Sequence, residues 1–130
     1  MSLTQLSSKE LERGVPDHKY IDANITLTKD DGPYLWVVRA KGVTITLPDS
    51  TGAGADRNMW TILEDVSGAG TVIQFDAADS CDYAGGTTTI GGTLTGATTN
   101  KPGSYIRISG PNGGGANFVL KERRGNWTAA

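Results

Sequence analysis

The sequence predicts an all-β fold, a compact β-sandwich or barrel-like roll of roughly eight to ten short antiparallel strands. Gly is frequent, at 18 of 130 residues, and Thr is abundant, a mixture typical of short strands joined by tight turns. Between these turns, most runs alternate apolar and polar residues with a period of two. A chain of 13.6 kDa fits one domain with a single modest core.

The clearest strands lie in the middle of the chain. Residues 43–47 alternate and stop at Pro48, which has no N–H to donate to a neighbouring strand. Residues 59–63 are rich in large apolar and β-branched side chains, and residues 71–75 form the next alternating run. Residues 67–70, Ser-Gly-Ala-Gly, join these two runs by a turn in which glycine can adopt positive φ.

Two more strands are predicted before this stretch, over residues 21–29 and 34–40, with a turn at residues 30–33. Together with residues 43–47, we expect them to form a meander. The run at 34–40 is almost continuously apolar, which is typical of a strand buried on both faces. We expect the core on one face and a neighbouring subunit on the other. The residues assigned to this subunit interface are Tyr34, Trp36 and Val38.

The C-terminal part of the chain alternates less regularly. Residues 104–109 and 117–122 predict two clean strands, and Trp127 follows them. Residues 87–90 and 93–95 fit either two short edge strands or one long surface hairpin.

The first 20 residues are predicted to form an N-terminal arm, and residues 21–130 a single β domain. Within the arm, Ser7 as N-cap, Glu10 at the capping-box position and Gly14 as the stop indicate a short helix. Because so short a helix is marginal alone, the arm either orders against another surface or is a frayed terminus.

Charge and hydropathy exclude several classes of partner. The net charge of -2 and the pI near 5.2 give no overall attraction to nucleic acid or to an anionic membrane. No apolar run approaches the roughly 18 residues of a membrane span, and no secretion signal is present, so we expect a soluble protein made in a cytoplasm. The single cysteine excludes an internal disulfide framework.

Asp76, Asp79 and Asp82, with Ser80 between them, offer the oxygen ligands that Ca²⁺ takes. Their spacing matches no calcium-loop template, and Asp is common in turns, so turn residues are the preferred interpretation.

The other reactive residue types lack partners in the sequence. His18 is the only histidine, and Cys81 has neither a nearby histidine nor a second cysteine. Glu64 and Asp65 are adjacent on a strand end, so their side chains point to opposite faces and cannot act as a carboxylate pair. We therefore predict no catalytic residue, no cofactor and no metal.

Three other patterns in the sequence suggest binding sites. The loop Gly52-Ala53-Gly54 is not followed by the helix that a phosphate-binding loop needs. Arg123 and Arg124 near Trp127 resemble a patch for single-stranded nucleic acid, but the negative net charge favours a hairpin turn before a core tryptophan. Five aromatic residues form either a sugar-stacking platform or packing contacts, and packing is preferred. They are Tyr34, Trp36, Trp60, Tyr83 and Tyr105.

Four segments together resemble a recurrent small β-module of tailed-bacteriophage virion proteins, found in tail fibres, tail spikes and head-decoration proteins. The segments are Thr-Leu-Pro at residues 46–48, the strand at 60–63, the turn and strand at 67–73, and Gly-Asn-Trp at 125–127. The resemblance spans roughly the last two thirds of the chain. Residues 76–100 are longer and richer in Thr than the module, and Arg123-Arg124 replaces its usual neutral turn.

The resemblance implies a non-enzymatic virion structural protein. A compact chain with an N-terminal arm suits a capsid decoration or cement protein, and such proteins are usually homotrimers that bury an apolar face between copies. The arm would then attach the protein to other capsid or tail proteins of the particle. The residues expected to make this attachment are Leu3, Leu6, Leu11, Val15 and Tyr20. The alternative is a receptor- or glycan-binding module of a tail fibre or spike, in which Tyr83 or Tyr105 contacts a bacterial surface sugar.

Overall fold

The computed structural model describes residues 17–32, 34–49, 59–110 and 117–130. Within these residues it contains twelve strands and one short 3-10 helix. The strands are β1 (His18–Ile21), β2 (Ile25–Thr26), β3 (Leu35–Val38), β4 (Thr44–Thr46), β5 (Met59–Glu64), β6 (Val72–Gln74), β7 (Ser80–Tyr83), β8 (Gly86–Thr87), β9 (Thr93–Gly96), β10 (Tyr105–Ser109), β11 (Asn117–Arg124) and β12 (Trp127–Ala129), and the 3-10 helix is η1 (Lys29–Asp31). The predicted helix in the arm lies outside the described residues.

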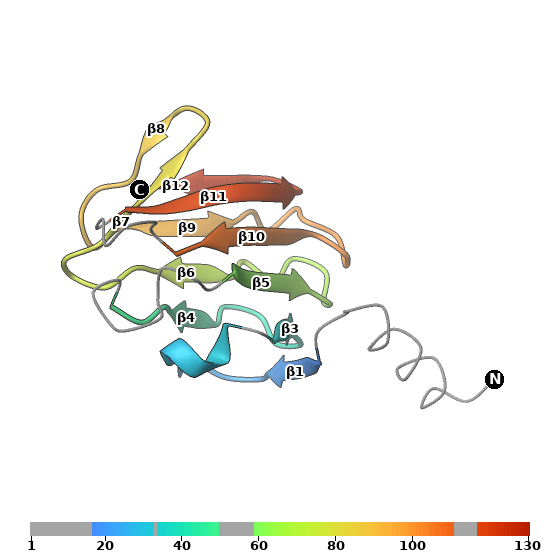
Figure 1. The fold of residues 1–130 in the computed structure, drawn as a ribbon. Helices are drawn as coiled ribbons and strands as arrows, with labels where there is room; N and C mark the ends of the chain where they lie inside the picture. The colour runs from blue at the N-terminus through green and yellow to red at the C-terminus, as the bar shows by residue number, and fades with distance from the viewer. Residues whose placement is uncertain (1–16, 33, 50–58, 111–116) are drawn as a thin grey trace.

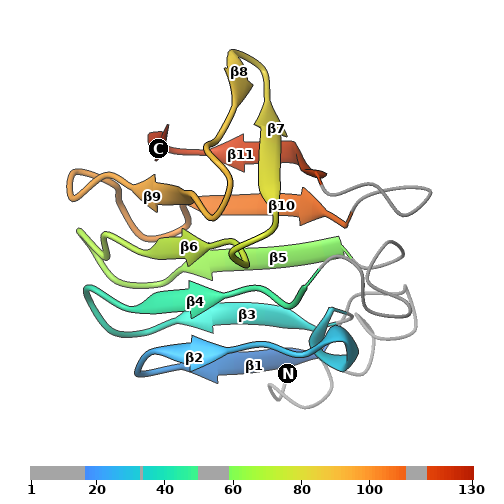
Figure 2. The ribbon, with the colours of Figure 1, turned by 90° about the vertical axis from the view of Figure 1, so that its left-hand side faces the viewer.

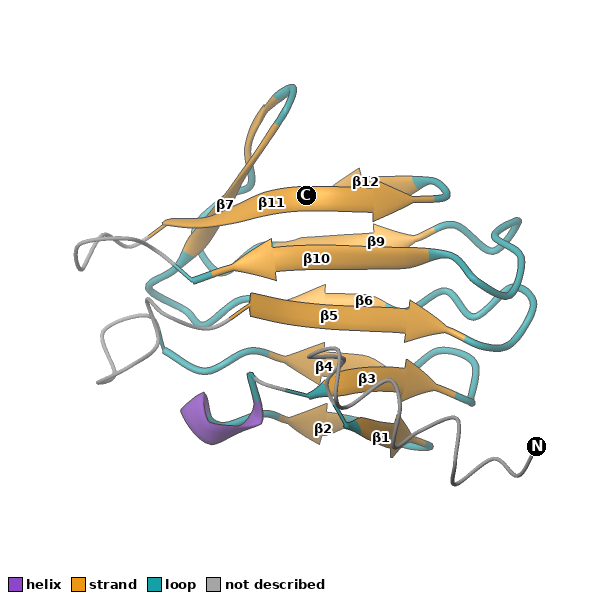
Figure 3. Cartoon of the chain, turned by 45° about the vertical axis from the view of Figure 1, so that its right-hand side comes forward, coloured by secondary structure: helices purple, strands orange, loops and turns teal. Residues whose placement is uncertain are grey.

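The strands form two sheets that face each other, so the predicted β-sandwich is confirmed (Figures 1 and 3). Sheet A has the strand order β1-β3-β5-β10-β11-β7-β8, and sheet B has the order β12-β9-β6-β4-β2. Because β1 lies in sheet A, its residues 18–20 belong to the sandwich, although the sequence assigned them to the arm. None of the helices in the described segments is long and apolar enough to cross a membrane.

The first six strands alternate between the two sheets. The chain runs from β1 in sheet A to β2 in sheet B and back to β3, so each pair forms one layer of a flattened coil (Figure 2). Consecutive strands within each sheet are therefore parallel: β1 with β3, β3 with β5, β2 with β4, and β4 with β6. The predicted meander and the all-antiparallel arrangement are both wrong, because each turn carries the chain across to the other sheet.

The chain then reverses direction. β9 is antiparallel to β6, and β10 is antiparallel to β5. β11 and β12 form the last layer, antiparallel to β10 and β9. β9 is thus an interior strand of sheet B, and the hairpin in this region is formed by β7 and β8, which project from the stack (Figure 1).

The core lies between the sheets, and the period-two alternation places its side chains. In β5, Trp60, Ile62 and Glu64 are buried while the residues between them are partly exposed. The rings of Phe75 and Phe118 meet at 5.4 Å between centroids. The alternating runs therefore identified correctly which face of each strand is buried, although not which strand is its neighbour.

The turn after β5 requires glycine, as predicted. Gly68 has φ of 64°, and a Cβ at this position would lie 2.8 Å from the backbone oxygen of Thr98. Both the left-handed backbone and the close approach of the neighbouring loop exclude a side chain here.

A buried polar network ties this end of the sandwich together. The carboxyl oxygens of Glu64, which is 0% exposed, accept hydrogen bonds from the backbone N–H of Thr71 and from Nδ2 of Asn100, each at 3.2 Å. Asn100 also donates to the backbone oxygen of Asn126 and accepts from its N–H. Three loops thus share one network, which favours a single arrangement of them.

Replacing Thr71 by Val is expected to raise the free energy of unfolding by about 1 kcal/mol. The buried Oγ1 of Thr71 has no hydrogen-bond partner among the residues that the structure describes, whereas its N–H donates to Glu64 and is retained in the variant. Urea unfolding followed by circular dichroism measures the change. A loss of stability would mean that the hydroxyl has a partner after all.

Candidate functional site

A cavity of about 320 Å³ lies at the end of the sandwich formed by β11 and β12, beside the β7–β8 hairpin. Its inner wall is apolar: Leu94, Leu120, Trp127 and Ala129 come from three strands of the two sheets. Tyr83, at the end of β7, adds a partly exposed aromatic ring on the hairpin side. A mainly apolar concavity with a few polar groups is the usual form of a small-molecule site.

A β-bulge in β11 shapes the charged rim of this cavity. Leu120 pairs with Ile108 and Glu122 with Arg107, so Lys121 is an extra residue between the two pairs. The bulge shifts the pairing register by one residue, so Arg123, which pairs with Ile106, lies on the same face of β11 as Leu120 and lines the cavity. Nη1 of Arg123 donates to the backbone oxygen of Trp127 at 3.5 Å.

The carboxylate of Glu122, also on the rim, is held toward the outer face of sheet A. Its oxygens accept hydrogen bonds from the hydroxyl of Tyr105 and from Nη1 of Arg107. The Tyr105 hydrogen bond is the main reason why the pKa of Glu122 is lowered, and the same bond raises the pKa of Tyr105. The negative charge of Glu122 is therefore committed to these partners, and Lys121 and Arg123 give the rim its remaining charge.

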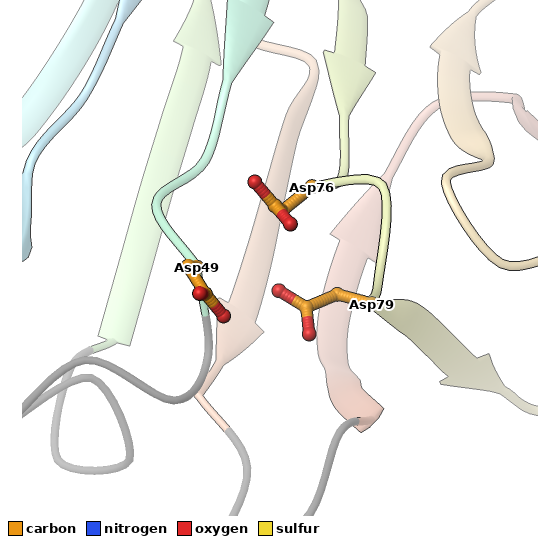
Figure 4. Close-up of side chains that lie close together, drawn as sticks. All are labelled: Asp49, Asp76 and Asp79. Atoms are coloured by element: carbon orange, nitrogen blue, oxygen red, sulfur yellow. The ribbon is translucent and has the colours of Figure 1, made fainter.

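Three aspartates lie close together where β4 and β6 end and β7 begins (Figure 4). One carboxylate oxygen from each of Asp49, Asp76 and Asp79 lies within 4.8 Å of the others, and Asp79 is buried. The sequence had grouped Asp79 and Asp76 with Asp82, but Asp82 instead accepts a hydrogen bond from the hydroxyl of Thr87. Oxygen-only donor sets suit Ca²⁺, yet a group of carboxylates is also a common feature of protein surfaces.

Cys81 has the character of a core residue. It is fully buried, and burial, followed by the charge of Asp82, raises its pKa from 9.0 to about 12. This agrees with the interpretation of Cys81 as an unreactive thiol, since the thiolate is the nucleophilic form. His18 is exposed on the edge strand β1.

We expect the Cys81 thiol of the folded protein to react with iodoacetamide far more slowly at pH 8 than the thiol of the urea-unfolded chain. The raised pKa lowers the thiolate fraction by roughly a thousandfold, and burial restricts access further. Because the folded-state pKa is the higher one, the stability linked to this group is present below pH 9.0 and is lost as the pH rises toward about 12. Equal rates in the two states would contradict the buried placement of Cys81.

The residues predicted for particle attachment fall mostly outside the described part of the chain, namely Leu3, Leu6, Leu11 and Val15. Tyr20 lies in β1 and is 53% exposed on the outer face of sheet A. The guanidinium of Arg39 sits 4.0 Å from its ring centroid and forms an ion pair with Asp22 at 2.8 Å. Tyr20 is therefore presented to solvent in a defined position.

The residues predicted for a subunit interface are largely covered by the chain itself. Trp36 and Val38 are 5% and 0% exposed within its own core, and Tyr34 packs edge-on against Trp36 at 6.2 Å. Val37, on the opposite face of β3, is 5% exposed. The strand is thus buried on both faces, as predicted, but Trp36 and Val38 need no neighbouring subunit to bury them.

The aromatic residues do not form one sugar-stacking platform. Trp36 and Trp60 are in the core, and Tyr105 lies on the outer face of sheet A, away from the cavity lining. Tyr83 alone of the five reaches the cavity, where it is joined by Trp127, a core residue as predicted, which also lines the cavity. The Gly-Asn-Trp segment at residues 125–127 was the available signal for this second ring.

Comparison of the chain with protein-family models, with characterised proteins and with solved structures gives no match.

Proposed function

We propose that the chain is a non-enzymatic structural protein of a bacteriophage particle, which decorates the capsid as an oligomer, in the simplest case a homotrimer. Made in the host cytoplasm, it would be carried on the virion. The sequence resemblance to virion β-modules suggests the class of protein. One surface of the fold supports association, and it is the observation on which the proposal depends.

That surface is an apolar row on the outer face of sheet A. The strand register aligns Tyr20 with Val37, Val37 with Leu63, and Leu63 with Tyr105, across β1, β3, β5 and β10. These side chains alternate with the core residues of their strands, so they point away from sheet B. Tyr20 is 53% exposed and Leu63 and Tyr105 are partly exposed, whereas Val37 between them is 5% exposed. The accessible part of the row therefore consists of Tyr20, Leu63 and Tyr105, and neighbouring apolar side chains of this kind are typical of a protein contact surface.

The outer face of sheet B is different in character. Its register aligns Thr44, Val72, Thr95 and Thr128 in one row and Thr26, Thr46, Gln74 and Thr93 in the next. This face accounts for much of the Thr abundance in the sequence, and its hydroxyl groups favour contact with water. We therefore assign the contact between copies to sheet A rather than to sheet B.

The predicted arm joins the fold beside the apolar row, because β1 begins at His18 and carries Tyr20. In the proposal, the row contacts a second copy, and the arm contacts the capsid by main-chain and apolar interactions. The residues that would make the capsid contact are Leu3, Leu6, Leu11, Val15 and Tyr20.

Deleting residues 1–14 tests the attachment directly. The deletion leaves every described strand in place, so we expect the truncated protein to keep its circular dichroism spectrum and to lose co-sedimentation with capsids. Thr128→Ala, a change on the exposed Thr face, is the matched control and should co-sediment normally. A truncated protein that still decorates capsids would refute the role of the arm.

A second candidate function, a receptor-binding module for a bacterial surface glycan, is favoured by the position of Tyr83 on the cavity. On this alternative, Tyr83→Ala should abolish a glycan-array signal, whereas Tyr105→Ala should leave it intact because Tyr105 is bonded to Glu122 on the outer face of sheet A. Absence of any array signal would favour the decoration function alone.

A further inference from the structure

We propose that the cavity between β11 and β12 binds a carboxylated sugar unit. The inference rests on the second candidate function, glycan binding, and names the chemistry of the glycan. Three features of the cavity carry it: the aromatic and apolar wall, the free backbone groups of an edge strand, and the positive charge of the rim.

The wall suits the C–H face of a sugar ring. Tyr83 and Trp127 approach the cavity from the hairpin and from β12, and Leu94 and Leu120 lie between the sheets. Aromatic rings combine a large apolar surface with little loss of side-chain entropy on binding. A cavity of about 320 Å³ is at the small end of ligand sites, which fits a compact ring-sized ligand.

The edge of β12 offers hydrogen-bonding groups to the hydroxyls of such a ring. On its inner side, β12 pairs with β9, and Ala130 exchanges both backbone hydrogen bonds with Thr93. Because alternate residues of an antiparallel strand point their N–H and C=O to opposite sides, those of Ala129 point to the outer edge. No described strand pairs with this edge, and Ala129 lines the cavity.

The rim selects a negative charge. Lys121 projects at the bulge and forms no ion pair within the described residues, and Arg123 donates only the long 3.5 Å bond to Trp127. Glu122 is turned to Tyr105 and Arg107, so it does not neutralise them. Hydrogen bonds between such cations and a carboxylate are among the strongest that a protein surface makes.

An extended peptide is the competing occupant, because free strand edges also accept a further strand. β12 has only three residues, and only alternate residues turn their backbone groups to its free edge. This edge is therefore too short to hold an added strand in register. The compact cavity and the two cations on its rim, Lys121 and Arg123, therefore favour a carboxylated sugar over a peptide.

The test is a titration of ¹⁵N-labelled protein with glucuronic acid, and with glucose as the neutral counterpart, followed by two-dimensional NMR. We expect glucuronic acid to shift the indole N–H of Trp127 and the amides of Lys121 and Ala129, and to bind about tenfold more tightly than glucose. Shifts elsewhere on the chain, or a strand-forming peptide acting where neither sugar does, would overturn the assignment.

Lys121→Gln tests the contribution of the positive charge separately from that of the apolar cavity wall. We expect this change to weaken the binding of glucuronic acid by about tenfold and to leave the binding of glucose unchanged, because only the carboxylate of the acid contacts the Lys121 ammonium group. Lys101→Gln, an exposed lysine outside the cavity lining, is the matched control and should change neither. Equal binding of the two sugars would refute the preference for a carboxylated sugar but leave the glycan-binding function in place. If neither sugar shifts the NMR signals of the cavity residues, both the preference and the glycan-binding function are refuted.

Discussion

Replacing Phe118 by Ala is expected to lower the free energy of unfolding by about 3 to 5 kcal/mol. Phe118 is 0% exposed, and its ring packs against that of Phe75, the residue that follows β6. Truncation removes the buried ring and leaves a cavity that the two sheets cannot close, since both are fixed by their strand pairing. Urea unfolding followed by tryptophan fluorescence gives the difference.

The neighbouring residue Val119 provides the control for this measurement. It lies on the same strand but on the outer face of sheet A, where it is only partly buried. Val119→Ala should therefore cost about 1 kcal/mol or less. Similar losses at the two positions would mean that β11 does not face the core as described.

The second large effect is expected at Glu64, where replacement by Ala should lower the free energy of unfolding by about 2 to 3 kcal/mol. The change removes the acceptor for the backbone N–H of Thr71 and for one of the two hydrogen bonds of the Asn100 amide. A buried N–H without an acceptor lowers stability by more than the lost hydrogen bond alone, because the group has also lost its hydrogen bond to water on folding.

Two variants test whether the network or merely the volume matters. Glu64→Gln keeps the shape and one acceptor oxygen, so we expect a loss of about 1 kcal/mol. Asp65→Ala, at the next and exposed position, should change stability by about 0.5 kcal/mol at most. If Glu64→Gln were as damaging as Glu64→Ala, the hydrogen bonds described here would not be the source of the effect.

The sequence contained the burial pattern of the fold but not its winding. Alternation in residues 43–47 and 59–63 predicts which side chains are buried, because period two is a local property of a strand. The partner of each strand depends on whether a turn folds back or crosses between sheets. The turns at residues 39–43 and 65–71 contain glycine in either case, and so the parallel layers could not be distinguished from a meander.

The candidate site was accessible from the sequence only in part. Tyr83 is predicted as an alternative sugar contact, and the prediction of Trp127 as a core residue is confirmed by its 7% exposure. The sequence does not show that Trp127 also lines the cavity. The charge of the rim depends on the bulge at Lys121 and on the pairing of Glu122 across the sheet. Asp49 joins Asp76 and Asp79 from a strand end 27 residues away from Asp76 in sequence, a proximity that only the winding creates.

The central claim, that the chain associates through the apolar row of sheet A, is tested most directly by its mass in solution. Light scattering behind a sizing column should give three times the chain mass of 13.6 kDa, and Leu63→Arg, which places a charge in that row, should reduce it to a single chain. A wild-type mass of 13.6 kDa would contradict the claim.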